Sequence, residues 1–249
     1  AQPEGTQRVQ VWVLHELADL VTAVNACSSR IVQVVMQVGP WFLHFISAYA
    51  PVSDAPDDVR GAFWEDLQAV VESAHIVGGR SLVFMGIDAN ARVGSVPSTA
   101  VGSVSPDVES CNGAALREMA EAVGLRVVNT FHDAGKTWSH PIRGEMRSDY
   151  ILASPLLGGM EHECKVDSGI DLATKSRDDH LLLKCGWRGM LTWMYKQLDT
   201  EDEKAAFSKA KLPHAPRYDP QSLRDPAAIT YFQTLMRTAP TTGQYVNDG

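Results

Sequence analysis

Apolar residues fall in short runs separated by turn signals near the start of the chain. Residues 30–38 and 41–48 are rich in valine, isoleucine and aromatic residues, and Gly39 and Pro40 lie between them. β-branched and aromatic residues favour strands, and a Gly-Pro pair favours a turn. The pattern therefore predicts two strands that form a hairpin. The second strand should end before Pro51, because proline cannot continue a central ladder of hydrogen bonds.

The strongest helical pattern follows this hairpin. Apolar side chains recur at helical spacing at Val59, Phe63, Leu67, Val70, Val71 and Ala74. Acidic residues precede this stripe, as is typical of the first turn of a helix. We expect the stripe to pack on a core, and a second helix to cover residues 112–123.

Further short apolar runs predict strands. They cover residues 81–85, 125–129, 136–139, 147–153 and 181–183. Composition changes after Gly186, where prolines become frequent. We therefore predict one domain over residues 1–186 and a linker with a helical tail over residues 187–249. Within that tail, residues 198–211 and 226–236 are predicted as helices, with an extended linker at 213–223.

The composition is that of a globular protein, with 45% apolar and 21% charged residues among 249. The formal net charge is −8, from 30 acidic and 22 basic residues. An acidic chain argues against a nucleic-acid binder that relies on bulk positive charge. It is compatible with an enzyme that uses clustered carboxylates to hold a cation.

The four cysteines are far apart in the sequence and form no C-x-x-C pair, so neither a zinc module nor a disulfide scaffold is indicated. Reduced thiols in an intracellular protein are the simpler interpretation. No apolar run approaches the ~20 residues that span a bilayer, so we expect no membrane segment. Because the chain begins at Ala1 without an initiator methionine, we expect it to be a fragment.

Polar side chains gather at the ends of predicted strands. Asp88 and Asn90 follow one strand, Asp149 lies within another, and Asp179 and His180 precede a third. A single acidic residue at a strand end is usually a turn former. A buried charge is costly unless it is paired or bound to a metal, so this set together suggests one shared site.

Five motifs carry a family resemblance. In order they are Ser47-Ala48-Tyr49-Ala50-Pro51, Gly86-Ile87-Asp88-Ala89-Asn90-Ala91, Thr137-Trp138-Ser139, Arg147-Ser148-Asp149-Tyr150-Ile151-Leu152 and Asp178-Asp179-His180. They resemble the endonuclease/exonuclease/phosphatase superfamily, and within it the apurinic-endonuclease-like domains of non-LTR retrotransposons. The resemblance covers most of residues 10–240. Its tail is similar to the linker that precedes a reverse transcriptase, which would be a downstream partner in the full polyprotein.

The resemblance implies a four-layer α/β sandwich of two mixed sheets flanked by helices, and cleavage of a phosphodiester in DNA. By position, Asp88 would position or deprotonate the attacking water, and Asn90 and Tyr49 would bind the phosphate. His180 would contact a phosphate oxygen and would be oriented by Asp149. We interpret Thr137 and Trp138 as packing residues. A nuclear location would follow if the parent element is active.

The resemblance also implies a divalent cation, Mg²⁺ or Mn²⁺. The residues that match its binding positions are Asp88, Asn90, Asp179 and His180. Carboxylate oxygens suit such hard cations.

The family also has an upstream strand ending in asparagine and a Q-E-T segment whose glutamate binds the metal. Only 48 residues precede Tyr49, and Glu4 lacks that context. We therefore expect the first strands and the metal-binding glutamate to be missing, and cleavage by this chain to be weak or lost.

Three functions stay open at this point. The first is a metal-dependent nuclease domain from a retroelement. The second is a catalytically inactive remnant with the same fold. The third is a phosphatase or phosphodiesterase of the same superfamily that acts on lipid or inositol phosphates. The residues after Asn90 and after Gly186 favour a retroelement over the third function.

Overall fold

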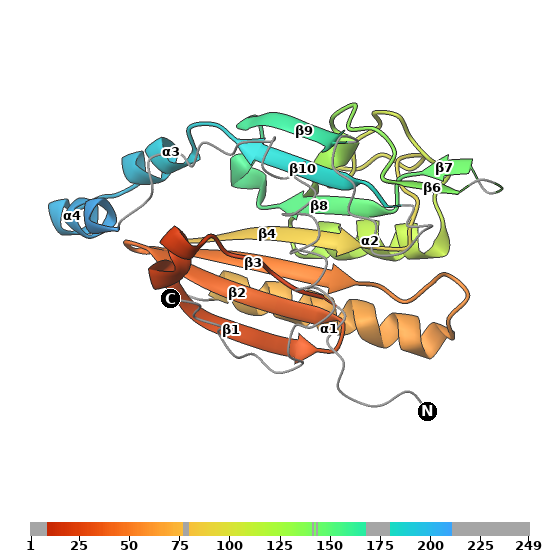
Figure 1. Ribbon diagram of the computed structural model, residues 1–249, viewed down its shortest axis with the longest axis horizontal. Helices are drawn as coiled ribbons and strands as arrows, with labels where there is room; N and C mark the ends of the chain where they lie inside the picture. Colours follow the sequence, from red (N-terminus) through yellow and green to blue (C-terminus); the bar gives the residue numbers. More distant parts are fainter. Residues whose placement is uncertain (1–8, 77–79, 141, 143, 168–179, 211–249) are drawn as a thin grey trace, which may run out of the picture.

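The computed structural model describes residues 9–76, 80–140, 142, 144–167 and 180–210. A six-stranded mixed sheet runs through the molecule (Figure 1). In order across the sheet its strands are β1 (Val21–Ser28), β2 (Ile31–Val38), β3 (Trp41–Tyr49), β4 (Ser81–Asp88), β8 (Asp149–Ala153) and β5 (Arg126–Val127). β4 pairs in parallel with β3 and antiparallel with β8, and it therefore joins the two halves of the sheet.

The predicted hairpin is confirmed as β2 and β3, which pair in full register from Ile31 opposite Ala48 to Val38 opposite Trp41. Gly39 makes the turn with a φ of 58°. A side chain at this glycine would also meet the backbone of Phe207, which lies 2.7 Å from where a Cβ atom would be. Only glycine suits both the left-handed backbone and this close approach.

Helix α1 (Asp57–Ile76) forms the crossover between the parallel strands β3 and β4 and confirms the first predicted helix. Most of its stripe packs on one face of the sheet, where Leu67 and Val71 are fully buried. Val59, in the first turn, is 45% exposed, so the prediction that it packs on the core is wrong. Helix α2 (Cys111–Ala122) lies on the same face. It begins at Ser110, whose hydroxyl caps it by accepting the backbone N–H of Gly113, as expected of a serine at this position.

The other face of the sheet is covered by the antiparallel pair β9 (Glu161–Asp167) and β10 (Leu182–Trp187). Helices α3 (Met190–Lys196) and α4 (Glu201–Lys209) follow, and Met194 and Phe207 join the same apolar cluster. About half of this cluster is only partly buried, whereas nearly all of the cluster beneath α1 and α2 is fully buried. Helices, a mixed sheet and a second sheet are stacked in layers, which confirms the predicted α/β sandwich.

The remaining elements are short. They are the 3₁₀ segments η1 (His15–Leu20), η2 (Val128–Thr130) and η3 (Pro155–Leu157), and the two-stranded sheet of β6 (Trp138–His140) and β7 (Gly144–Met146). Among the described residues, no helix has the length and apolar character needed to cross a membrane.

Several elements differ from the sequence prediction. The strand predicted at residues 125–129 ends at Val127, because the Thr130 hydroxyl donates to the Val127 carbonyl and closes a 3₁₀ turn. β9 was not predicted, since its mostly charged sequence carries no apolar run. The predicted helix at 198–211 is α4, which begins at a capping box formed by Thr200 and Glu203.

The linker at 213–223 and the helix at 226–236 lie outside the described residues. The domain division at residue 186 stays a prediction. α3 and α4 are attached to the preceding part through the second apolar cluster and through an ion pair of 2.6 Å between Arg80 and Asp199.

Leu116 tests the packing between the helices and the sheet. It is fully buried in the cluster that both helices share. Replacing Leu116 with alanine should lower the free energy of unfolding by about 2–5 kcal/mol, through lost apolar burial and the cavity left behind. Denaturant titration followed by circular dichroism measures this. Leu156→Ala is the matched control, because Leu156 is 59% exposed and its loss should change stability by about 0.5 kcal/mol or less.

Candidate active site

Three polar side chains, those of Tyr49, Asp88 and Asp149, lie in a row across neighbouring strands. Tyr49 ends β3 and is paired in register with Asp88, which ends β4, and Asp88 is paired in register with Asp149, which begins β8. Residues paired in register project from the same face of a sheet. Leu82 and Phe84 of β4 face β9 and β10, and the alternation of the strand carries Asp88 to that face.

His180 reaches this row from a distant part of the chain. It lies just before β10, and its backbone forms a bridge with Trp138. Its Nδ1 atom lies 3.0 Å from Oδ2 and 3.3 Å from Oδ1 of Asp149. Ligand atoms of Asp88, Asp149 and His180 all lie within 4.8 Å of one another. The structure thus brings together three of the residues that the sequence assigned to a shared site.

The backbone at Asp149 is hydrogen bonded to a buried threonine side chain. The Thr137 hydroxyl oxygen accepts the backbone N–H groups of Ser148 and Asp149, each at 3.0 Å. The Ser148 hydroxyl in turn donates to Oδ2 of Asp149 at 2.9 Å. Thr137 has no exposed surface. The burial agrees with the prediction that Thr137 is a packing residue, and its hydroxyl in addition fixes the start of β8.

A second buried group supports the same strand. Asn129 donates to the Asp149 carbonyl at 3.0 Å and accepts the Ile151 N–H at 3.2 Å. The guanidinium of Arg147 is 1% exposed and donates to the Asn129 carbonyl at 2.6 Å. It also donates to the carbonyls of Val104 and Ser105, at 3.2 and 2.9 Å. A buried charge is tolerated here because carbonyl oxygens surround it.

Asn129 was missed by the sequence analysis, and Arg147 was quoted only as part of a motif. The sequence did carry a signal for Arg147. It is a charged residue next to an apolar strand, and a charged residue that becomes buried there needs hydrogen-bond partners.

Asn90 supports Asp88 directly. Its backbone N–H donates to Oδ1 of Asp88 at 3.1 Å, and its side-chain amide donates to the Ala50 carbonyl at 3.0 Å. Asn90 has a φ of 45°, a left-handed conformation that asparagine tolerates better than most residues. Its amide therefore ties the end of β4 to the end of β3, beside the row of polar residues.

Tyr49 lies against a cation that the sequence analysis did not single out. The guanidinium of Arg30 is 5.1 Å from the centre of the Tyr49 ring and donates to the Tyr49 carbonyl at 3.1 Å. Cation–π contacts of this kind fix an aromatic ring in place.

Asp178 and Asp179 lie outside the described residues, so the metal-binding role predicted for Asp179 stays untested.

The donor set suits a hard divalent cation. Asp88 and Asp149 offer carboxylate oxygens from adjacent strands, and His180 adds an imidazole within the same 4.8 Å. Mg²⁺ typically takes one or two carboxylates and completes its shell with water or substrate phosphate. The residues therefore fit Mg²⁺ or Mn²⁺, and Asp88 and Asp149 would hold it.

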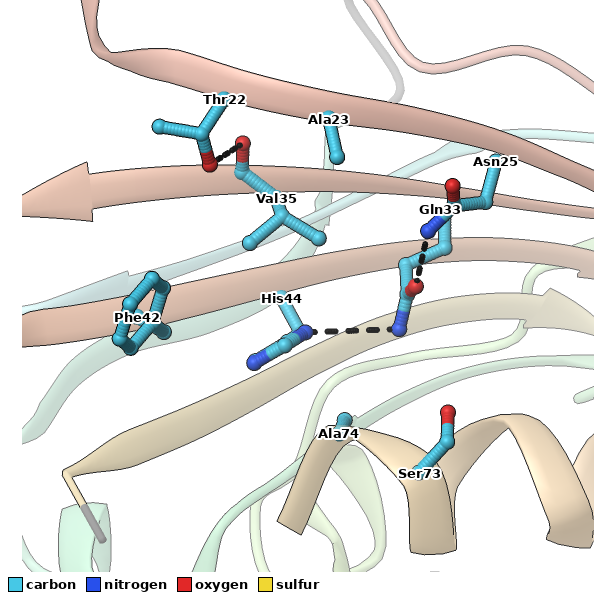
Figure 2. A pocket seen from close by; sticks show the side chains of 9 residues that line it. All are labelled: Thr22, Ala23, Asn25, Gln33, Val35, Phe42, His44, Ser73 and Ala74. Atoms are coloured by element: carbon cyan, nitrogen blue, oxygen red, sulfur yellow. Dashed lines mark hydrogen bonds between the residues drawn. The ribbon is translucent and has the colours of Figure 1, made fainter. Parts of the chain in front are cut away.

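A pocket of about 300 Å³ lies away from this row, between the end of α1 and strands β1, β2 and β3 (Figure 2). Asn25, Gln33 and His44 form a hydrogen-bonded line across its floor, with distances of 2.9 and 3.4 Å. Burial lowers the pKa of His44, and the nearby His75 lowers it further. The pocket contains none of the motif residues, so we place the candidate active site at the strand ends.

No family model matches the sequence, and no curated protein matches it either. Among solved structures, the chain is similar to the endonuclease domain of TRAS1, a telomere-specific non-LTR retrotransposon. The two share 22% identity over 69% of this chain and 70% of that chain, with a TM-score of 0.50. The chain has the endonuclease/exonuclease/phosphatase fold.

Two further structures give lower TM-scores. The 3′ phosphatase NExo from Neisseria, bound to a product DNA hairpin, is 17% identical over 74% of this chain and 72% of that one, with a TM-score of 0.48. An AP endonuclease from Archaeoglobus fulgidus is 18% identical over the same shares, with a TM-score of 0.46. The endonuclease/exonuclease/phosphatase fold agrees with the resemblance seen in the sequence motifs, while the roles of individual residues stay predictions.

Thr137 tests how the site is supported. Thr137→Val removes the oxygen that accepts two buried N–H groups, so the free energy of unfolding should fall by about 2–5 kcal/mol. Thr137→Ser keeps the hydroxyl and loses one methyl group, at roughly 1 kcal/mol. Hydrogen exchange should show faster exchange of the Ser148 and Asp149 amides in the valine variant only. Equal exchange in both variants would contradict the role assigned to the hydroxyl.

His44 should make stability fall at mildly acidic pH. Its folded pKa is lowered, so below about pH 6.5 the unfolded chain binds a proton that the folded chain does not. Stability is therefore highest above pH 6.5 and is lost as pH falls. Tm measured between pH 7.5 and 5.5 should decline less steeply in His44→Gln than in the parent. His15→Gln, at an exposed position, should leave the slope unchanged.

Proposed function

We propose that this chain is a divalent-metal-dependent phosphodiester hydrolase of the endonuclease type, with DNA as its substrate. The observation that carries the proposal is the convergence of Asp88, Asp149 and His180 within 4.8 Å at the ends of neighbouring strands. The fold supports a phosphodiester hydrolase in general, since a solved structure that it resembles is an endonuclease domain.

In this proposal His180 and Asp149 work as a pair. Asp149 accepts from Nδ1, which fixes the orientation of the imidazole ring and sets the role of its other nitrogen. A protonated ring donates from both nitrogens, so Nε2 would donate to a phosphate oxygen as negative charge develops there. Such a donor is worth several kcal/mol in a reaction that builds charge on oxygen.

Asp88 would act on the attacking water. The N–H of Asn90 holds one of its oxygens, which keeps the carboxylate turned in a fixed direction. A carboxylate fixed in this way accepts a proton from a water molecule and aligns it for attack. A bound Mg²⁺ or Mn²⁺ would supply positive charge next to the phosphate.

Tyr49 and Arg30 would form the phosphate side of the site. Tyr49 stands next to Asp88 in the row, and Arg30 adds a positive charge beside the tyrosine ring. A guanidinium offers planar donors that match phosphate oxygens. The net charge of −8 would repel DNA at long range, so contact with the backbone must rely on local cations of this kind.

A plasmid-nicking assay tests the proposal. The chain incubated with supercoiled plasmid in Mg²⁺ or Mn²⁺ should nick it slowly, and EDTA should stop the reaction. His180→Ala or Asp88→Ala should each lower the rate by about 10²-fold or more, because each removes a group that acts on the reacting phosphate or water.

Two matched variants control for effects on folding and charge. Asp58→Ala and His15→Ala change exposed residues of the same types away from the row, and both should nick at the parent rate. Nicking that survives His180→Ala and Asp88→Ala would refute the site. A folded parent protein that never nicks in either metal would refute the activity and favour the inactive remnant.

A further inference from the structure

Two of the four cysteines, distant in the sequence, lie directly opposite each other in the fold. Cys164 is in β9 and Cys185 is in β10, and the two are register partners in the antiparallel pair. Residues directly opposite in antiparallel strands have Cα atoms roughly 4.5–5.5 Å apart. This separation falls within the range that a disulfide spans, about 4.4–6.8 Å.

Both side chains point the same way. Cys164 is buried in the apolar cluster between the two sheets, at 7% exposure, and Cys185 packs against that cluster and is only partly buried. The interaction between the two neighbouring thiols lowers the pKa of Cys164 and, together with burial, raises that of Cys185. Of the two thiols, Cys164 is therefore the one that loses its proton first.

We propose that Cys164 and Cys185 are a site of reversible oxidation, at which a low-molecular-weight disulfide such as oxidised glutathione converts the pair to a cross-strand disulfide. The two remaining cysteines do not share this arrangement. Cys27 and Cys111 are both exposed, and Cys111 lies near Arg60 and Ser53 rather than near another cysteine.

The reaction balances in two exchange steps. One protein thiolate attacks a sulfur of oxidised glutathione, the reagent's S–S bond breaks, and one glutathione leaves and takes up a proton. The second protein thiol loses its proton and attacks the protein sulfur of the mixed disulfide, which releases the second glutathione. Two electrons pass from the protein thiols to the reagent.

The bond would link β9 to β10, the two strands that cover the face of the main sheet opposite α1 and α2. It would close a loop from residue 164 to residue 185, and His180 lies within that loop. Closing a loop restricts the unfolded chain more than the folded one, so the oxidised protein should be more stable. This inference rests on the fold and is independent of the proposed nuclease activity.

The test uses the full chain with Cys27→Ser and Cys111→Ser, which leaves only the pair. Oxidised glutathione should lower the intact mass by two hydrogens, and peptide mapping should find the bond between Cys164 and Cys185. Tm should rise on the order of 5–10 °C, and dithiothreitol should reverse both changes.

Single variants separate the pair from general thiol reactivity. Cys185→Ser in the same background should gain no internal bond and no rise in Tm with the oxidant. If a single variant does not fold, thiol titration of the Cys27→Ser and Cys111→Ser chain decides, since its two thiols should become none with the bond mapped to the pair. A mass gain from stable mixed disulfides, or an unchanged mass after prolonged oxidation, would overturn the proposal.

Discussion

The position of β4 between a parallel neighbour and an antiparallel neighbour is the constraint on which the site depends. β3 brings Tyr49 to the same edge as Asp88 because parallel strands end on the same side, and β8 begins there because it runs the other way. Side chains alternate along a strand, so a slip of one residue would turn Asp88 toward the buried cluster beneath the helices. The fully buried residues Leu82 and Val83 fix that register. The core thus determines which face of the sheet carries the carboxylates.

A second set of polar groups, none of them proposed to touch substrate, stabilises the start of β8. Thr137, Asn129 and Arg147 are all almost completely buried. Thr137 and Asn129 hydrogen bond to backbone atoms of Asp149, and Arg147 donates to the carbonyl of Asn129. Buried backbone N–H and carbonyl groups need hydrogen-bond partners, and these side chains provide them where the hydrogen bonds between strands stop. β8 is therefore held in place beyond the residues that pair with β5, and the aspartate at its first position is held with it.

The sequence predicted most of the main sheet and both helices of the buried face, because their apolar residues repeat at clear periods. It also placed Asp88, Asp149 and His180 near strand ends, where buried charge stands out. It missed β9, because an outer strand with solvent on one side carries charged residues and leaves no apolar run. For the same reason the sequence showed the cysteines only as far apart, since the nearness of Cys164 to Cys185 depends on a pairing that the sequence pattern did not reveal. Thr137 was predicted to be structural and is, but its hydrogen bonds were not foreseen, because a hydroxyl that accepts backbone hydrogen bonds looks in the sequence like any small polar residue.

The two apolar clusters differ in how completely they are buried, and the residues of the candidate site depend on different clusters. Asp88 belongs to a strand anchored by the fully buried cluster, whereas His180 enters from the side where about half of the apolar residues keep some contact with water. Regions with less burial open more readily in brief local unfolding events. The ensemble should therefore contain states in which the central sheet is intact but the histidine has left the carboxylates. The fraction of molecules with a complete site is then set by the docking equilibrium of β9 and β10, and not by the global stability of the fold.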